Sequence, residues 1–105
     1  MDEIIFSVGM QVEFDDDKDE INRKKHKFSL NCAQDIVDSI ILFGKDHYIM
    51  SDGYIENEEQ RYMMLTEYRD DIVLIAFTWR NGTMRAISFR KANPKEVGIF
   101  NDHVG

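Results

Sequence analysis

Hydrophobic and polar residues alternate along the second half of the chain in the way that β-strands require. Residues 72–78 are apolar on both alternating faces, which is typical of a central strand covered on each side. Residues 61–66 and 83–89 predict the neighbouring strands, and Asn81-Gly82 is a strong signal for a two-residue hairpin before the last of them. The pattern therefore predicts an antiparallel meander of three strands.

The first half of the chain has the spacing and the end signals of helices. Asp15 is a candidate N-cap for a helix that ends near His26, because acids fill its first turns and bases its last. The apolar stripe of this helix is thin and comprises Phe14, Ile21 and Phe28. We therefore expect the helix to pack at a rim of the domain.

Capping residues indicate two further helices. Ser29 is a candidate N-cap for a helix that extends to about Asp38. Near the C-terminus, Asn93 precedes Pro94, and proline is well suited to the first position of a helix. A C-terminal helix is therefore expected to begin there.

Shorter segments complete the predicted order of elements. Residues 10–14 and 40–43 each predict a short strand, and residues 45–57 predict a loop with room for a strand at residues 48–50. The order is then β-α-α-β-β-β-α, an α+β domain whose antiparallel sheet carries its helices on one face. A length of 105 residues without internal repeats predicts one domain, residues 1–105.

Composition narrows the class of protein. Apolar residues make up 43% of the chain and aromatic residues 11%, which argues against disorder. The single cysteine, Cys32, excludes an intramolecular disulfide and fits a reducing compartment. No apolar stretch has the length of a membrane span, and no basic leader precedes the first short apolar run, so we expect a cytoplasmic protein without a membrane partner.

Charge is distributed unevenly along the chain. The net charge of −7 argues against broad nucleic-acid affinity, which depends on neutralising phosphates. Residues 1–20 hold eight acids and one lysine, whereas residues 80–96 hold five cations and one acid. A second basic run covers residues 23–27. The two concentrations of positive charge indicate sites for an anionic ligand.

Four short segments stand in order along the chain: Glu13-Phe14-Asp15 with Lys18, Asn22 and Lys25-His26; Glu59 with Arg61; Phe77-Thr78 with Arg80; and Arg85-Ala86-Ile87-Ser88-Phe89-Arg90-Lys91-Ala92. Together they resemble the signature of BrnT-type toxins, in register from about Val12 to Glu96. The resemblance implies a RelE-like ribonuclease fold and a type II toxin that cleaves RNA and arrests growth. It further implies neutralisation by a BrnA-like antitoxin, which itself binds operator DNA.

Three residues depart from that family signature. Phe14 stands in place of a tryptophan, Lys27 in place of a glycine and Trp79 in place of a glutamate. Lys27 therefore requires either a different helix end or an unusual backbone angle. Lys27, Trp79 and the acidic net charge keep a second hypothesis open, a binding module that has lost the nuclease activity and regulates transcription through an antitoxin-like partner. A third reading is a small α+β domain with unrelated partners.

Cleavage of RNA through its 2′-hydroxyl requires a base, cations for the phosphoryl oxygens and an acid for the leaving oxygen. Arginine suits the phosphoryl oxygens and histidine suits proton transfer. Candidate catalytic residues are Arg90, Arg85, His26, Arg61 and Lys25. Regular alternation places Arg85 and Arg90 on opposite faces of their strand, so they converge only if the strand twists or bulges near Phe89. For each of these residues the structural alternative is an ion pair, a helix-end contact or a packed stem.

The remaining charged and aromatic residues have lesser expected roles. Lys91, Arg80 and Lys95 are candidate substrate-binding residues, while His47 and His103 are expected to have no role. The histidines and Cys32 lack metal-ligand spacing and there is no phosphate-binding glycine loop, so no metal or cofactor is expected. Tyr62, Met64 and Trp79 are candidates for a partner surface, with the core as their alternative location.

Overall fold

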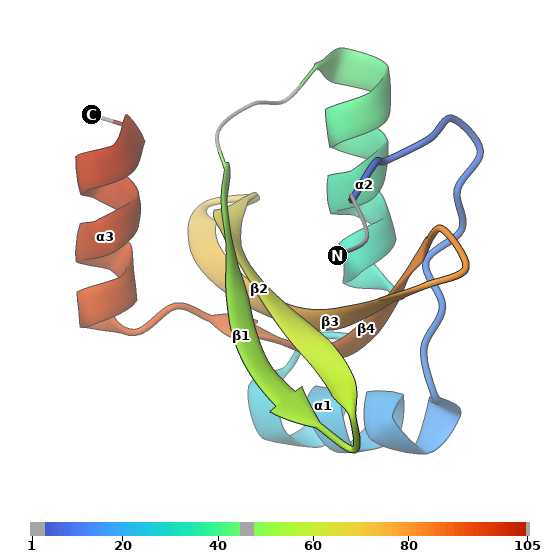
Figure 1. The fold of residues 1–105 in the computed structure, drawn as a ribbon. Coiled ribbons are helices and arrows are strands. Elements are labelled where there is room, and N and C mark those ends of the chain that lie inside the picture. The colour runs from blue at the N-terminus through green and yellow to red at the C-terminus, as the bar shows by residue number, and fades with distance from the viewer. Residues whose placement is uncertain (1–3, 45–47, 105) are drawn as a thin grey trace.

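The computed structural model describes residues 4–44 and 48–104 and forms an α+β fold, as predicted. Its four strands make one antiparallel sheet in the order β1-β2-β3-β4 (Figure 1). The elements in chain order are α1 (Asp16–His26), α2 (Cys32–Phe43), β1 (Tyr48–Glu56), β2 (Glu59–Tyr68), β3 (Asp71–Arg80), β4 (Thr83–Lys91) and α3 (Pro94–Val104).

The three predicted strands and the hairpin between the last two are confirmed as β2, β3 and β4. Asn81 and Gly82 have positive φ angles of 52° and 73°, as the tight hairpin turn between β3 and β4 requires. The ends predicted for the first helix and the start of the last are also confirmed. The Asp15 carboxylate accepts hydrogen bonds from the N–H groups of Asp17 and Lys18, and Pro94 begins α3. The Ser29 cap is wrong, because α2 begins at Cys32 after Asn31 and extends beyond Asp38 to Phe43.

The strand predicted at residues 40–43 is wrong, because these residues form the last turn of α2. Ile40 and Ile41 pack against the main core and continue the apolar face of that helix, and Gly44 ends it in the left-handed conformation. A run of four apolar residues does not distinguish a strand from a buried helical turn. The strand allowed at residues 48–50 is confirmed as the start of β1, whereas the loop predicted for residues 51–56 is wrong, since β1 continues to Glu56 and pairs with β2 on both sides of an irregularity between Asp52 and Ile55.

The strand predicted at residues 10–14 is reduced to one isolated parallel bridge. Glu13 pairs with the outer edge of β4, its N–H donating to the Met84 carbonyl at 2.9 Å and its carbonyl accepting from the Ala86 N–H at 2.8 Å. Gln34 of α2 holds the same segment by hydrogen bonds to Val12 and Met10. The observed order is therefore α-α-β-β-β-β-α.

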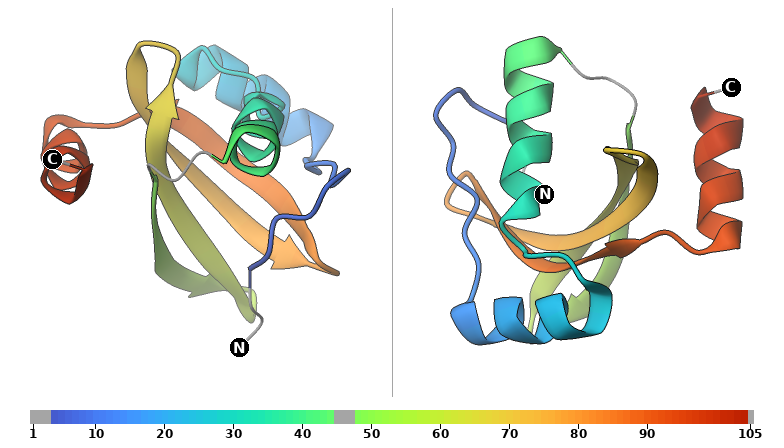
Figure 2. Two further views of the ribbon diagram at one scale, coloured as in Figure 1. Left: turned by 90° about the horizontal axis from the view of Figure 1, so that it is seen from above. Right: turned by 180° about the vertical axis from the view of Figure 1, so that it is seen from behind.

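The helices do not all lie on one face of the sheet, in contrast to the prediction (Figures 1 and 2). Ile36 and Val37 of α2 pack in the same core cluster as Met64 and Ile75 of the sheet. The adjacent strand residues, Leu65 and Leu74, point the other way and pack with Phe100 of α3. Phe100 therefore packs on the second face of the sheet, the face opposite α2. This second face has an apolar end, which α3 covers, and a polar end.

Helix α1 lies along the outer edge of β4 and is held there by a buried amide. The Asn22 side chain donates to the carbonyls of Phe28 and Phe89 at 2.8 and 2.9 Å and accepts from the Phe89 N–H at 3.1 Å. Asn22 thus satisfies edge groups of β4 that would otherwise lack partners. Of the predicted apolar stripe, Phe14 and Phe28 pack against the main core, whereas Ile21 in the middle of the helix is 62% exposed.

Of the residues considered for a partner surface, Tyr62 and Met64 are buried in the main core. Trp79 is half-buried and its ring meets that of Phe6 edge-on, with centroids 5.9 Å apart. The expected surface role is therefore wrong for Tyr62 and Met64. Among the described residues, no helix is long and apolar enough to cross a membrane.

Candidate functional site

A β-bulge in β4 decides which of its side chains share a face. Ser88 is opposite Ala76, and Ala86 is opposite Phe77, so Ile87 is the additional residue. Met84, Ala86 and Phe89 consequently all lie in the main core. Arg85 and Arg90, which regular alternation would separate, therefore lie on the same side of the strand, the side away from that core.

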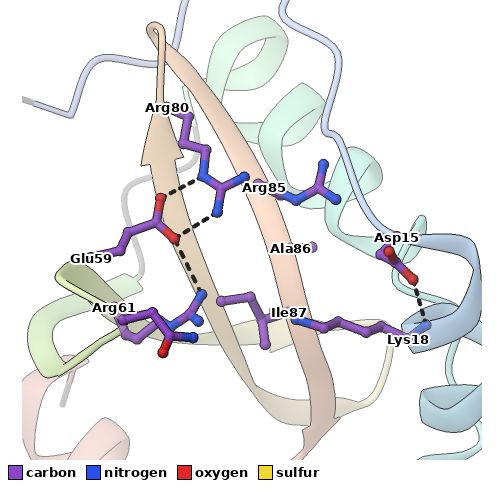
Figure 3. A pocket seen from close by; sticks show the side chains of 9 residues that line it. Asp15, Lys18, Glu59, Arg61, Arg80, Arg85, Ala86 and Ile87 are labelled. Carbon is purple, nitrogen blue, oxygen red and sulfur yellow. Dashed lines mark hydrogen bonds and ion pairs between the residues drawn. The ribbon is translucent and has the colours of Figure 1, made fainter.

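A cavity of about 330 Å³ opens at the polar end of this second face, where β2 and β4 begin and β3 ends (Figure 3). The N-terminal turn of α1 closes one side of it. Its walls carry four cationic side chains and two carboxylates; they comprise Asp15, Lys18, Asn57, Glu59, Arg61, Arg80, Arg85, Ala86 and Ile87. Three of the predicted site residues, Arg61, Arg80 and Arg85, are thus brought together, and positive charge predominates.

Glu59 lies between two of these arginines. Its carboxylate accepts hydrogen bonds from Arg80 Nε and from Arg80 Nη2, the latter at 2.7 Å, and Arg61 Nη1 is 3.6 Å away. The hydrogen bond from Arg80 is the main cause that lowers the pKa of Glu59 below its usual value. Glu59 is therefore ionised at neutral pH and holds both guanidinium groups at the cavity.

Arg61 is the most buried cation of the cavity, with a side chain only 9% exposed. Its Nη2 lies 3.4 Å from Glu56 Oε2, and its Nε has no hydrogen-bond partner in the part of the chain that the structure describes. A buried guanidinium with long contacts and an unused donor is incompletely satisfied. Both readings from the sequence, an ion pair and an anion contact, are compatible with this position.

Arg85 is less tightly held than the other two arginines. Its Nη1 is 3.8 Å from Glu13 Oε2, which is beyond hydrogen-bond distance, and its side chain is partly exposed. It projects from the strand beside the cavity in Figure 3. An incoming anion would therefore displace only a weak contact at Arg85.

Arg90 lies near the other end of β4 and is not one of the residues that line this cavity. It forms two parallel hydrogen bonds with Glu96, from Nη1 to Oε1 at 2.8 Å and from Nη2 to Oε2 at 3.0 Å. These bonds raise the pKa of Arg90 above its ordinary value. The ion pair that the sequence offered as the structural alternative for Arg90 is therefore present.

A second, smaller cavity of about 160 Å³ follows the first along the groove between α1 and β4. It is lined by Lys18, Ile21, Asn22, Lys25, His26, Ile87 and Ser88. Burial is the first cause that lowers the pKa of His26, and the charges of Lys25 and Arg90 lower it further. The imidazole is consequently neutral at pH 7, the form in which it accepts a proton.

The two remaining predicted cations lie away from both cavities. Lys91 is solvent-exposed, with Nζ 3.6 Å from Asp71, and Lys95 is exposed on α3. His103 is also exposed on α3, and His47 lies outside the described residues. Within residues 4–44 and 48–104, no three His, Cys, Asp or Glu side chains lie close enough together to hold a metal ion.

Residues 14–96 match the sequence profile of a family described as "Ribonuclease toxin, BrnT, of type II toxin-antitoxin system". The chain belongs to the BrnT family. The family resemblance seen in the sequence is thereby confirmed, although no curated protein sequence matches the chain. Membership supports a ribonuclease toxin that acts on RNA and has an antitoxin protein as partner.

The match to the BrnT family begins at Phe14, directly before the Asp15 N-cap, and ends at Glu96. It therefore includes the residues that line both cavities and the Arg90–Glu96 pair. Sequence reasoning about this BrnT chain did not name Glu59 or Lys18 as site residues. Both residues lie in the segments that resemble the family signature, and this resemblance was the only sequence signal for a role in the site. Their contribution depends on contacts between β2, β3 and α1 that are distant in sequence.

Proposed function

We propose that this BrnT-family chain is a toxin that cleaves RNA endonucleolytically without a metal ion. The observation that carries the proposal is the convergence of four cations, Lys18, Arg61, Arg80 and Arg85, on one cavity of about 330 Å³. Arginine forks match phosphate bidentately, so this cavity suits the scissile phosphate. Enclosed cations stabilise developing phosphoryl charge more strongly than exposed ones do.

In the proposed reaction the ribose 2′-oxygen attacks the adjacent phosphorus and the 5′-oxygen of the next nucleotide leaves. Neutral His26 removes the 2′-hydroxyl proton, with Lys25 beside it, and the leaving 5′-oxygen takes a proton from solvent. Arg61 and Arg85 stabilise the phosphoryl oxygens, and Arg80 and Lys18 bind the substrate. Arg90 acts from the far end of the groove, because its positive charge lowers the pKa of His26. Lys91 and Lys95 attract RNA from outside the groove.

The test is RNA cleavage by the purified, antitoxin-free protein in the presence of a chelator. Arg85→Ala is expected to reduce the rate by roughly 100-fold, the scale for losing one charge-stabilising donor. Arg90→Ala tests the residue favoured by the sequence, and its effect should be smaller because it lies outside the cavity. The matched control is Arg69→Ala, in the turn between β2 and β3 at the opposite end of the strands.

Rates that are equal for the wild type, Arg85→Ala and Arg69→Ala would exclude the proposed site while leaving the enzyme in place. Absence of cleavage on every RNA offered, together with normal cell growth on expression, would exclude the nuclease. In the cell we expect growth arrest, relieved by co-expression of a BrnA-like antitoxin that also carries the operator-DNA contact. We propose that residues 1–105 act as a single domain in the cytoplasm.

A second candidate function rests on the carboxylates that already occupy the arginines. Arg80 is held bidentately by Glu59, and Arg90 is held bidentately by Glu96. A chain in which these pairs persist would bind its antitoxin and regulate transcription without cleaving RNA. A folded protein that binds the neighbouring gene product but neither cleaves RNA nor slows growth would favour this binding module.

A further inference from the structure

We propose that the second cavity, between α1 and the bulge of β4, is a subsite for a nucleobase of the bound RNA. The proposal rests on the proposed function, in which this cavity also holds the base His26, and assigns a ligand to the apolar wall of the same cavity. It deepens that function by naming where the protein reads the substrate beyond its phosphate.

The first argument is the continuity of the two cavities. They share Lys18 and Ile87, so the second begins where the phosphate-binding cavity ends. In a nucleotide the base is joined to the phosphate through one ribose. A ligand whose phosphate lies among the arginines therefore places its base toward the neighbouring cavity, beside α1.

The second argument is the character of the walls. Arg61, Arg80 and Arg85 line the first cavity, whereas none of the arginines lines the second, where Ile21 and Ile87 provide apolar surface. Ile21 is 62% exposed, and one exposed isoleucine alone would carry no meaning. Here it faces a common cavity with Ile87, which the bulge displaces from regular pairing. Apolar surface beside a phosphate pocket suits the flat face of a base.

The third argument is the presence of an unused hydroxyl. Ser88 lines the cavity, and its side chain has no hydrogen bond among the described residues, whereas His26 serves proton transfer. Asn22 uses its amide on Phe28 and Phe89 and is not available. A hydroxyl both donates and accepts, which are the contacts that base edges require.

The test compares binding of inorganic phosphate with binding of nucleoside 3′-monophosphates, followed by NMR with assigned isoleucine methyl groups. We expect the nucleotides to bind at least tenfold more tightly and to shift the Ile21 and Ile87 methyl signals through the ring current of the base. Ile21→Ala should remove most of that advantage and leave phosphate affinity unchanged. Ile99→Ala is the matched control, another exposed isoleucine on a helix but outside both cavities, and should change neither affinity.

A further arm uses an oligonucleotide with 2′-O-methyl groups, which binds without being cleaved. Tighter binding of this oligomer than of the mononucleotide supports RNA as the occupant, and the reverse order would identify a free nucleotide instead. Equal affinities for phosphate and nucleotides would overturn the subsite. So would an Ile21→Ala variant that weakens phosphate binding as much as nucleotide binding, because that result indicates a structural role.

Two further results distinguish the base subsite from the proposed nuclease activity and from a binding site for the antitoxin. If nucleotides bind in the expected pattern but no RNA is cleaved, the subsite stands and the nuclease falls. If nucleotides leave the Ile21 methyl unmoved while a cognate antitoxin shifts it, the cavity holds a protein side chain and the base assignment is overturned.

Discussion

Arg90 and Glu96 join the end of β4 to the first turn of α3 through two hydrogen bonds of 2.8 and 3.0 Å. The same glutamate accepts from the Asn93 N–H, while the Asn93 side chain accepts from the Glu96 N–H, forming a reciprocal helix cap. One carboxylate therefore both begins α3 and fixes the arginine that follows the bulge. Helix placement and the direction of Arg90 depend on each other.

Glu96→Gln is expected to lower the free energy of unfolding by about 1 kcal/mol, because the pair is only partly screened by solvent and glutamine still completes the cap. Hydrogen bonding from Arg90 lowers the pKa of Glu96 below its ordinary 4.5 in the folded state. Its stabilisation is thus present above pH 4.5 and is lost as the pH falls through the folded pKa. Urea unfolding should show the wild type and the variant converging in acid. A difference that grows toward low pH would contradict this account.

Arg61→Met should reduce RNA cleavage by roughly 100-fold while changing the free energy of unfolding by less than about 1 kcal/mol. The guanidinium is buried with an unpartnered Nε and long ion pairs, so its replacement by an apolar stem costs little. Glu59 keeps Arg80 as its partner, and Glu56 is largely in solvent. Calorimetry and the cleavage assay are measured on the same preparation. A loss of stability of several kcal/mol would show that Arg61 is structural.

Asn22→Ala should destabilise the protein by about 2–3 kcal/mol, because the buried N–H and carbonyl of Phe89 lose their partner. Denaturant unfolding gives the value, and hydrogen exchange at Phe89 should accelerate. The control is Lys24→Ala on the same helix, whose side chain is exposed and, within the described part of the chain, pairs with Glu20. If both substitutions have equal effects, the amide does not hold α1 to β4.

Lys27→Gly should raise the free energy of unfolding by about 0.5–1 kcal/mol, because Lys27 ends α1 with a φ of 68° that favours glycine. Such a gain in stability would explain why the family signature has a glycine at the position of Lys27. The control is Lys24→Gly, within α1, which should lose about 1 kcal/mol. Thermal unfolding of both variants checks the opposite signs. A destabilised Lys27→Gly protein would mean that the lysine side chain outweighs the backbone angle.

His26 should titrate below 6.5 in an NMR experiment, because burial and the charges of Lys25 and Arg90 disfavour its protonated form. Lys25→Met is expected to raise the pKa, and Lys24→Met should leave it unchanged. If neutral His26 is the base, the cleavage rate rises with pH through this pKa, and Lys25→Met moves the rise to higher pH. Titration at or above 6.5 would contradict the environment described for the imidazole.

The sequence allowed prediction of those elements whose signals are local. The Asn81-Gly82 turn, the Asp15 cap and the apolar run of residues 72–78 each act through neighbouring residues, and each is confirmed. Residues 40–43 were misassigned because a short apolar run has the same appearance in a buried helix and in a strand.

The candidate site was less predictable, since its contacts join residues far apart in sequence. Arg61, Arg80 and Arg85 were named as site residues, but Glu59, the partner shared by Arg61 and Arg80, was not. Regular alternation does not reveal the bulge at Ile87. From the sequence, Arg85 and Arg90 could be placed on one side of the strand only on the condition that the strand twists or bulges. Within α1 the buried contact is made by Asn22 and not by Ile21 of the predicted stripe, and a single buried amide leaves no periodic signal.

The additional residue at Ile87 determines which side chains in the C-terminal half of β4 face the core and which face outward. If Ile87 entered regular pairing instead, every side chain after it would be turned by one position, which would direct Phe89 toward solvent and Arg90 into the packed interior. Deletion of Ile87 would leave Ser88 opposite Ala76 and Ala86 opposite Phe77 in an unbroken ladder, with Phe89 still in the core. Loss of the bulge is therefore compatible with the packing of β4 only when the additional residue is lost with it.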